Sequence, residues 1–123
     1  MQKKIETVKT LLDALPFIKE FNKEIVVIKY GGSAQTSPQL KEKFAEDILL
    51  MYLVGIRPVI VHGGGYKITE MLDALNIETK FIDGQRVTTK EVMRIAEMIL
   101  SGEINKEIVS LLNSHGAKAI GVS

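Results

Sequence analysis

Two glycine-rich turns, each preceded by a run of β-branched residues, carry the residue types that suit phosphate chemistry. The first is Gly31-Gly32, two residues after Lys29, and the second is the triple glycine of residues 63–65. Glycine has no side chain, so the backbone N–H groups of such a turn can approach an anion closely, especially at the start of a helix. Lys29 places a cation beside the first turn. These residues therefore predict a site for a phosphate or a similar anion.

Neither turn matches a common nucleotide-binding motif. No Lys-Ser or Lys-Thr follows the triple glycine at P-loop spacing, and the G-x-G-x-x-G spacing is absent. Taken alone, the triple glycine is equally consistent with tight packing of a strand against a helix. Lys29 alone is consistent with a lysine that extends from a strand end into water. Two glycine turns beside one cation favour the functional interpretation.

Arg86 is a third candidate. Residues 80–87 form two short extended pieces around Asp83-Gly84, the strongest hairpin signal in the chain. Arg86 follows that turn directly. It is either a solvated hairpin charge or the partner of a carboxylate, which a guanidinium group binds with two parallel hydrogen bonds.

The elements around the two turns form a βαβ unit. Residues 25–28 and 59–61 are continuous apolar runs, typical of parallel strands buried on both faces. Ser37 and Pro38 predict the start of a helix between them, as N-cap and first helical residue, and Gly55 predicts its end. A right-handed crossover places both turns at the same edge of the sheet. Lys29 and the triple glycine are therefore expected to face one pocket.

The remaining pattern extends this sheet. A helix is predicted over 68–76, and Thr88 to Glu91 predict a capping box that opens another helix, which Gly102 ends. A further helix covers 104–112, and residues 118–123 begin a strand. Because an α/β domain seldom ends at the tip of a central strand, we expect a three-layer α/β sandwich with a mainly parallel central sheet, truncated at its C-terminal side.

An amphipathic helix precedes the first strand. Apolar residues recur at helical spacing from Ile5 to Leu15, and Pro16 should bend the helix before it reaches Phe21. The apolar stripe either covers the domain's own sheet or packs against another subunit. We therefore divide the chain into residues 1–22, a kinked helix for oligomerisation, and an α/β lobe over residues 23–123.

Composition narrows the class of protein. A chain of 123 residues with 25% charged and 46% hydrophobic residues is typical of one globular domain. The net charge of +1 indicates neither nucleic acid nor a membrane surface as a partner. Cysteine is absent and the two histidines stand in distant contexts, so no metal site is expected. The start lacks an apolar signal core, and a cytoplasmic location is expected.

Four segments, which together reach across nearly the whole chain, resemble the amino acid kinase family. They are VIKYGGSA at 27–34, VHGGG at 61–65, GQRVT at 84–88 and INKEIV at 104–109. The resemblance is greatest to the members that act in arginine biosynthesis. It implies transfer of the ATP γ-phosphate, with Mg²⁺, to the side-chain carboxylate of N-acetyl-L-glutamate. Such direct transfer needs alignment and charge neutralisation rather than a protein nucleophile.

The resemblance also assigns roles. It implies that Lys29 is catalytic and stabilises the charge of the transition state, and that Arg86 pairs with the α-carboxylate of the acceptor. The phosphoryl group and substrate are bound at the two turns by Gly31, Gly32, Gly64 and Gly65. Residues 1–22 resemble the N-terminal helix of the arginine-inhibited hexameric members, which implies a homo-oligomer, either a dimer or a hexamer. Residues 23–123 correspond to the acceptor-binding lobe.

Three residues beside these positions differ from those of many members: Tyr66 replaces proline, Gln35 methionine and Gln85 leucine. The ATP-binding half of the family cannot be located in the chain. We therefore expect these 123 residues alone to be inactive and to bind neither ATP nor Mg²⁺ tightly. Two alternatives stay open: a sibling kinase acting on an aminoadipate derivative, and an excised or redesigned folding or assembly module without catalysis.

Overall fold

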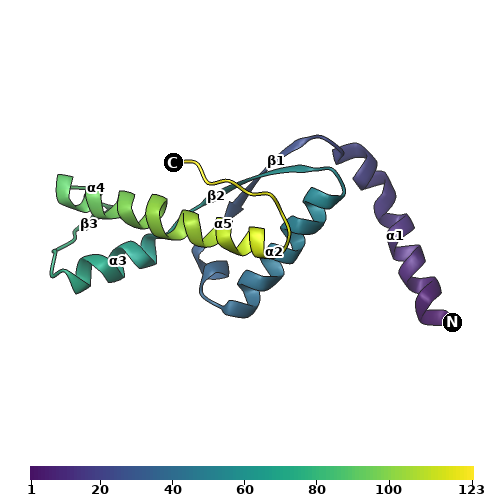
Figure 1. Ribbon diagram of the computed structural model, residues 1–123. Coiled ribbons are helices and arrows are strands. Elements are labelled where there is room, and N and C mark those ends of the chain that lie inside the picture. The colour runs from purple at the N-terminus through teal and green to yellow at the C-terminus, as the bar shows by residue number, and fades with distance from the viewer.

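The computed structural model describes residues 1–123 and confirms the α/β class (Figure 1). In chain order the elements are α1 (Gln2–Phe21), β1 (Ile25–Tyr30), the 3₁₀ helix η1 (Gly32–Gln35), α2 (Pro38–Leu53), β2 (Arg57–His62), α3 (Gly65–Ala74), β3 (Phe81–Ile82), β4 (Gln85–Arg86), α4 (Lys90–Glu97), the π-helical turn η2 (Met98–Ile104) and α5 (Asn105–Ser114).

The βαβ unit has the predicted form. Strands β1 and β2 are parallel neighbours, with Ile25 opposite Arg57 at one end and Tyr30 opposite His62 at the other. Helix α2 begins after Ser37 with Pro38 in its first turn, and Gly55 follows its end with a φ of 92° that favours glycine. Because both strands end at the same register position, the two glycine turns leave the sheet at one edge.

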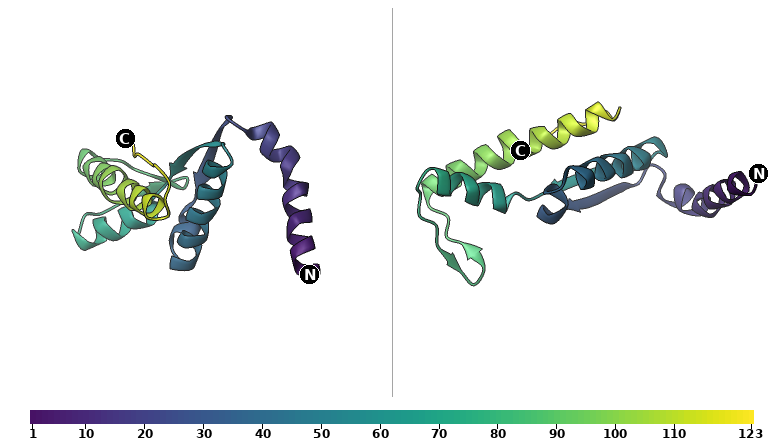
Figure 2. Two further views of the ribbon diagram at one scale, coloured as in Figure 1. Left: turned by 45° about the vertical axis from the view of Figure 1, so that its right-hand side comes forward. Right: turned by 90° about the horizontal axis from the view of Figure 1, so that it is seen from below.

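Only one face of the sheet is covered. Ile28 and Ile60 pack against the buried cluster that α2 and α5 contribute to, and Figure 2 shows these helices on the same side of the strands. On the other face Val27 and Val59 are 66% and 46% exposed. The prediction of strands buried on both faces was therefore wrong for residues 1–123, because none of their helices lies against this second face.

The hairpin was predicted correctly. Strands β3 and β4 pair antiparallel, with Phe81 opposite Arg86. Asp83 and Gly84 both have positive φ, 50° and 77°, which is the requirement of a type I′ turn. This turn brings Arg86 back along the chain toward the start of α3.

The predicted helix end at Gly102 was wrong. Helices α4 and α5 are continuous through η2, a π-helical stretch that takes Gly102 into the helix. Apolar residues at 99, 104 and 108 stay on the buried side across this stretch, which compensates for the low helix propensity of glycine. The cap also differs by one residue, because Thr89 rather than Thr88 accepts the backbone N–H of Val92.

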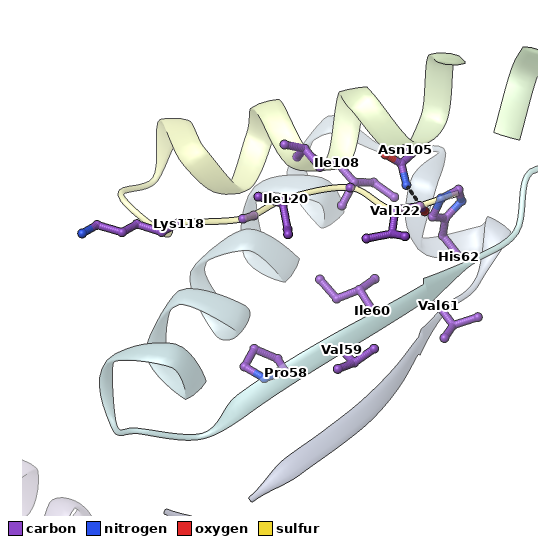
Figure 3. Close-up of a pocket in the computed structure, with 13 residues that line it drawn as sticks. Pro58, Val59, Ile60, Val61, His62, Asn105, Ile108, Lys118, Ile120 and Val122 are labelled. Atoms are coloured by element: carbon purple, nitrogen blue, oxygen red, sulfur yellow. Dashed lines mark hydrogen bonds between the residues drawn. The ribbon is translucent and has the colours of Figure 1, made fainter. Parts of the chain in front are cut away.

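The predicted strand at 118–123 was also wrong, because these residues have no regular secondary structure. Side chains of α5 bind their backbone instead: Asn113 pairs with both the N–H and the carbonyl of Ala119, and Asn105 donates to the carbonyl of Val122. Figure 3 shows the result. A cavity of about 570 Å³ separates residues 118–122 from β2, with Ile60 and Ile108 in its lining.

Helix α1 extends away from the rest of the molecule in both views of Figure 2. It is helical from Gln2 to Phe21 with Pro16 inside, and none of its residues is buried. Leu11, Leu12 and Phe17 are each more than 60% exposed. The chain contains no helix with the length and apolarity needed to span a membrane.

Candidate functional site

Lys29 is the second-last residue of β1 and lies on the uncovered face of the sheet. Its register partner on β2 is Val61, two residues before the triple glycine. The side chain is exposed, and it has no hydrogen bond or ion pair within the chain. The ammonium group is therefore free to approach an anion beside the two turns.

Within the triple glycine, one residue is closely packed and the other two have open surroundings. Gly64 is buried, and a Cβ atom built there would lie 2.1 Å from Cδ1 of Ile104 and 3.0 Å from Cδ2 of Leu100. A methyl group at this position would therefore have to displace the ends of the Ile104 and Leu100 side chains in η2. Cβ atoms built at Gly63 and Gly65 would meet no atom within 4 Å. Their backbone is open to a ligand.

Several backbone donors at this edge have no acceptor in the chain, and those of Gly31 and Gly64 are among them. The β1–β2 ladder ends at Tyr30 and His62, and the N–H groups of Gly31 and Gly64 beyond it make no hydrogen bond. N–H groups at the start of a helix have no acceptor within the helix, and they are satisfied by side chains, water or a ligand. Gly64 is also the residue before α3, where the helix dipole favours negative charge.

Two side chains join the first turn to the second. Gln35, only 4% exposed, donates to the carbonyl of Tyr30 at 2.9 Å and to that of Gly63 at 3.4 Å. The ring of Tyr66, on the first turn of α3, lies beside Gly32, so that a Cβ built there would be 3.9 Å from Cδ1 of the ring. The structure thus brings the two predicted turns together.

Arg86 reaches the same turn from the hairpin. Its Nη2 donates to Thr69 Oγ1 at 2.7 Å and to the carbonyl of Gly65 at 3.4 Å. The guanidinium carbon lies 4.7 Å from the centre of the Phe81 ring. The other terminal nitrogen, Nη1, is buried without an acceptor. Arg86 is therefore held at the start of α3 with one donor unused, rather than solvated on the hairpin.

An ion-pair network connects the helices that follow the two glycine turns. Glu107 of α5 binds Lys41 of α2 and, at 2.9 Å, Lys67 of α3, and Lys67 also binds Glu103 at 2.6 Å. The hydrogen bonds from Lys41 and Lys67 lower the pKa of Glu107, and the bond to Glu103 raises that of Lys67. One carboxylate thus joins the helices that follow both glycine turns.

Tyr30 connects this network to β1. Its ring stacks on Phe44 of α2, with centroids 3.8 Å apart, and its hydroxyl donates to the carbonyl of Ala34 in η1. Burial raises the pKa of this hydroxyl, and the negative charge of Glu107 raises it further. Tyr30 therefore remains neutral and fixes η1 from its inner side.

The sequence pattern did not indicate Thr69, Glu107 or the role of Gln35. Thr69 follows Gly65 by one helical turn, so its position on the same face of α3 was a usable signal. The partners of Glu107 lie 66 and 40 residues earlier in the chain, and no local pattern encodes such contacts. In the sequence, Gln35 differs from a family pattern, and nothing local indicates its contacts.

Comparisons with known proteins identify the family of the chain. The model of the amino acid kinase family matches residues 24–123. The acetylglutamate kinase of Sulfurimonas denitrificans is 85% identical over all 123 residues, and that of Nitratiruptor sp. is 76% identical over the same length. The chain spans only 44% and 43% of these two relatives, so it covers less than half of their length.

Solved structures show the same fold. N-acetylglutamate synthase from Neisseria gonorrhoeae, complexed with coenzyme A and N-acetyl-glutamate, superposes with a TM-score of 0.73 at 23% identity over 89% of this chain and 25% of that one. A protein from Streptococcus mutans superposes with a TM-score of 0.67 at 33% identity, over 77% of this chain and 38% of the other.

Proposed function

The chain belongs to the amino acid kinase family, and from this premise we propose that residues 23–123 form the acceptor-binding part of an acetylglutamate kinase. The reaction is transfer of the ATP γ-phosphate to the side-chain carboxylate of N-acetyl-L-glutamate. The relatives named acetylglutamate kinase support the substrate, and the geometry of the turns supports the assignment of residues.

One observation carries the proposal: three separate segments supply donors to one edge of the sheet. Gly31 and Gly64 present unpartnered N–H groups there, and Arg86 is bonded to the carbonyl of Gly65 with a further nitrogen unused. A buried guanidinium nitrogen without an acceptor is costly, which suits a carboxylate that enters from outside the chain. N-acetyl-L-glutamate carries such a group at its α-carbon.

The roles follow from charge. Arg86 binds the α-carboxylate, and the N–H groups of Gly31, Gly32, Gly64 and Gly65 hold the γ-carboxylate and the phosphoryl group. Lys29 lies next to them on β1 and neutralises charge that grows on the transferring group. Direct phosphoryl transfer is accelerated mainly by such positioning and electrostatic stabilisation.

ATP and Mg²⁺ belong to the longer enzyme in this proposal. The metal supplies neutralisation of phosphate charge when bound. No group of three or more acidic or histidine side chains that could hold a metal ion gathers in residues 1–123. We propose accordingly that the 123 residues alone do not turn over ATP, and that α1 joins copies of the protein into an oligomer.

The test uses residues 1–123 joined to the part of the Sulfurimonas denitrificans relative beyond its match to this chain, called the joined enzyme below. ADP release is measured with N-acetyl-L-glutamate and with an N-acetylated aminoadipate. We expect a clear preference for N-acetyl-L-glutamate. Equal use of both acceptors, or a folded but inactive joined enzyme, would contradict the proposal. Turnover by residues 1–123 alone would contradict the proposed inactivity and, equally, the alternative of a non-catalytic module.

A further inference from the structure

The hydroxyl group of Thr69 on α3 makes two hydrogen bonds at once. Its Oγ1 donates to the carbonyl of Gly65, one helical turn earlier, at 2.9 Å, and accepts from Nη2 of Arg86 at 2.7 Å. A hydroxyl group has one hydrogen and two lone pairs. Because Gly65 takes the hydrogen, a lone pair is directed at Arg86. Thr69 therefore connects the guanidinium group to the last residue of the triple glycine.

The hairpin that carries Arg86 has few other contacts with the rest of the molecule. In the right-hand view of Figure 2 it projects away from the helices, and it forms a sheet of its own. Phe81 and Ile82 are 55% and 65% exposed, so little apolar surface fixes the hairpin in place. The hydrogen bonds of Arg86 to Thr69 and Gly65 are the only ones that join residues 80–88 to α3.

The hairpin itself holds only one side of the guanidinium group. Phe81 is the register partner of Arg86, and its ring centre lies 4.7 Å from the guanidinium carbon, but this ring offers no oxygen or nitrogen acceptor. The closest acceptor comes from Thr69. A guanidinium group is planar and its donors have a fixed geometry. Holding Nη2 at Thr69 and one face at Phe81 therefore fixes the direction of Nη1, the nitrogen without an acceptor.

We infer that Thr69 is a positioning residue, which holds the Arg86 guanidinium group at a fixed distance from the glycine-turn edge, the edge of the sheet where residues 31–32 and 63–65 lie. This inference rests on the proposed function, in which Arg86 binds the α-carboxylate of the acceptor and the glycine turns hold its γ-carboxylate. Thr69 itself touches no substrate. It sets the spacing between the two carboxylate-binding groups.

A fixed spacing selects the length of the acceptor. An N-acetylated aminoadipate has one more methylene group than N-acetyl-L-glutamate between its two carboxylates, and both carboxylates cannot match one fixed spacing. Discrimination of one methylene group in a rigid site is worth about 10- to 200-fold in kcat/KM. A guanidinium group that is free to move would accept the longer molecule more readily. Thr69 is therefore also expected to determine specificity.

Two variants separate the hydroxyl group from the rest of the side chain. Thr69→Val keeps the branched shape and loses the hydroxyl group, whereas Thr69→Ser keeps the hydroxyl group. The matched control is Thr10→Val in α1. Thr10 makes the same type of bond, to the carbonyl four residues earlier at 3.0 Å, and has no hydrogen bond to another segment. The control therefore loses the bond within the helix and nothing else.

The experiment measures kcat and KM of the joined enzyme with N-acetyl-L-glutamate and with the N-acetylated aminoadipate. We expect Thr69→Val to raise KM for N-acetyl-L-glutamate about tenfold, because Arg86 loses its closest acceptor. The kcat should stay within about twofold, as expected where ground state and transition state are bound equally. The preference for N-acetyl-L-glutamate, as a ratio of kcat/KM values, should fall about tenfold. Thr69→Ser and Thr10→Val should behave as wild type.

A second measurement, made without substrate, separates this inference from the proposed function. In the joined enzyme with ¹⁵N-labelled arginine, the Nε–H signal of Arg86 is assigned by its loss in Arg86→Lys. This signal should shift in Thr69→Val and stay in place in Thr10→Val. An inactive wild type with this shift would overturn the function and keep the contact that positions Arg86. An unchanged signal would overturn the inference, as would an active Thr69→Val variant with normal KM and normal preference, or a Thr69→Ser variant that is equally impaired.

Discussion

The glycine-turn edge and helix α1 use their side chains in opposite ways. At the edge Gln35, Arg86 and Glu107 each bind at least one segment that is distant in the sequence. Helix α1 carries a regular apolar stripe from Ile5 to Leu15, and the large side chains of this stripe are exposed. The comparison shows that a regular sequence pattern predicts a helix or a strand, whereas only the side-chain contacts of that element show which other segments it binds. The glycine-turn edge is formed by contacts within this chain, whereas the apolar stripe of α1 has no partner within the chain.

The largest expected difference between the two regions concerns catalysis. Lys29→Ala removes the ammonium group beside the turns, and loss of one stabilising group of this kind costs about 100- to 1000-fold in kcat. The matched change in α1 is Lys19→Ala, an exposed lysine in its last turn, which should leave kcat unchanged. Steady-state kinetics of the joined enzyme provide the measurement. A Lys29→Ala variant with nearly normal kcat would show that this cation is not catalytic.

A second comparison lies within the triple glycine. Gly64→Ala places a methyl group against Ile104 and Leu100, and such overpacking costs about 1–3 kcal/mol of the free energy of unfolding. Gly65→Ala meets no atom within 4 Å and should leave stability unchanged or slightly higher, because alanine favours the helix. Urea unfolding of both variants measures the difference. Equal stability of the two would contradict the close packing of Gly64.

The third prediction concerns pH. The Glu107 pKa is lowered in the folded chain, so its contribution to stability is present above the unfolded pKa and is lost as pH falls through the folded value. Its side chain is 40% exposed, so solvent screens the pairs and Glu107→Gln should cost only about 1 kcal/mol at neutral pH. The cost should vanish in acid, below both pKa values.

The control for Glu107→Gln is Glu6→Gln in α1, where the side chain is exposed and unpaired. Its stability should follow wild type at every pH. Thermal unfolding across the acidic range compares the two variants. A penalty for Glu107→Gln that persists unchanged at low pH would indicate lost packing rather than lost charge.

The smallest effect on stability is expected in α1. Val8→Glu with Leu12→Glu puts charge on the exposed stripe, where neither residue is buried, so the free energy of unfolding should change by less than about 0.5 kcal/mol. The proposed oligomer should nevertheless dissociate, because the stripe loses its apolar contact. Light scattering of the joined enzyme measures the mass, and an unchanged mass would remove α1 from the assembly.

Local patterns predicted much of the fold. The Asp83-Gly84 hairpin and the start of α2 at Pro38 depend on neighbouring residues, and both were correct. Gly102 and residues 118–123 were wrong for one shared reason: distant packing overrode the local signal. Buried contacts of Ile99 and Ile104 keep the helix continuous through Gly102, and Asn105 and Asn113 take backbone groups that a strand would need.

The candidate site was also predicted only in part from the sequence. Sequence alone determined which residues have suitable chemistry: bare glycine turns, a lysine at a strand end and an arginine past a hairpin, because backbone access and charge are properties of residue type. Only the tertiary structure decided that Arg86 is bonded at Gly65 and that Gln35 connects the two turns. Those contacts join residues 21 and 28 positions apart. Their distances are set by the packing of helices and strands, which no local spacing records.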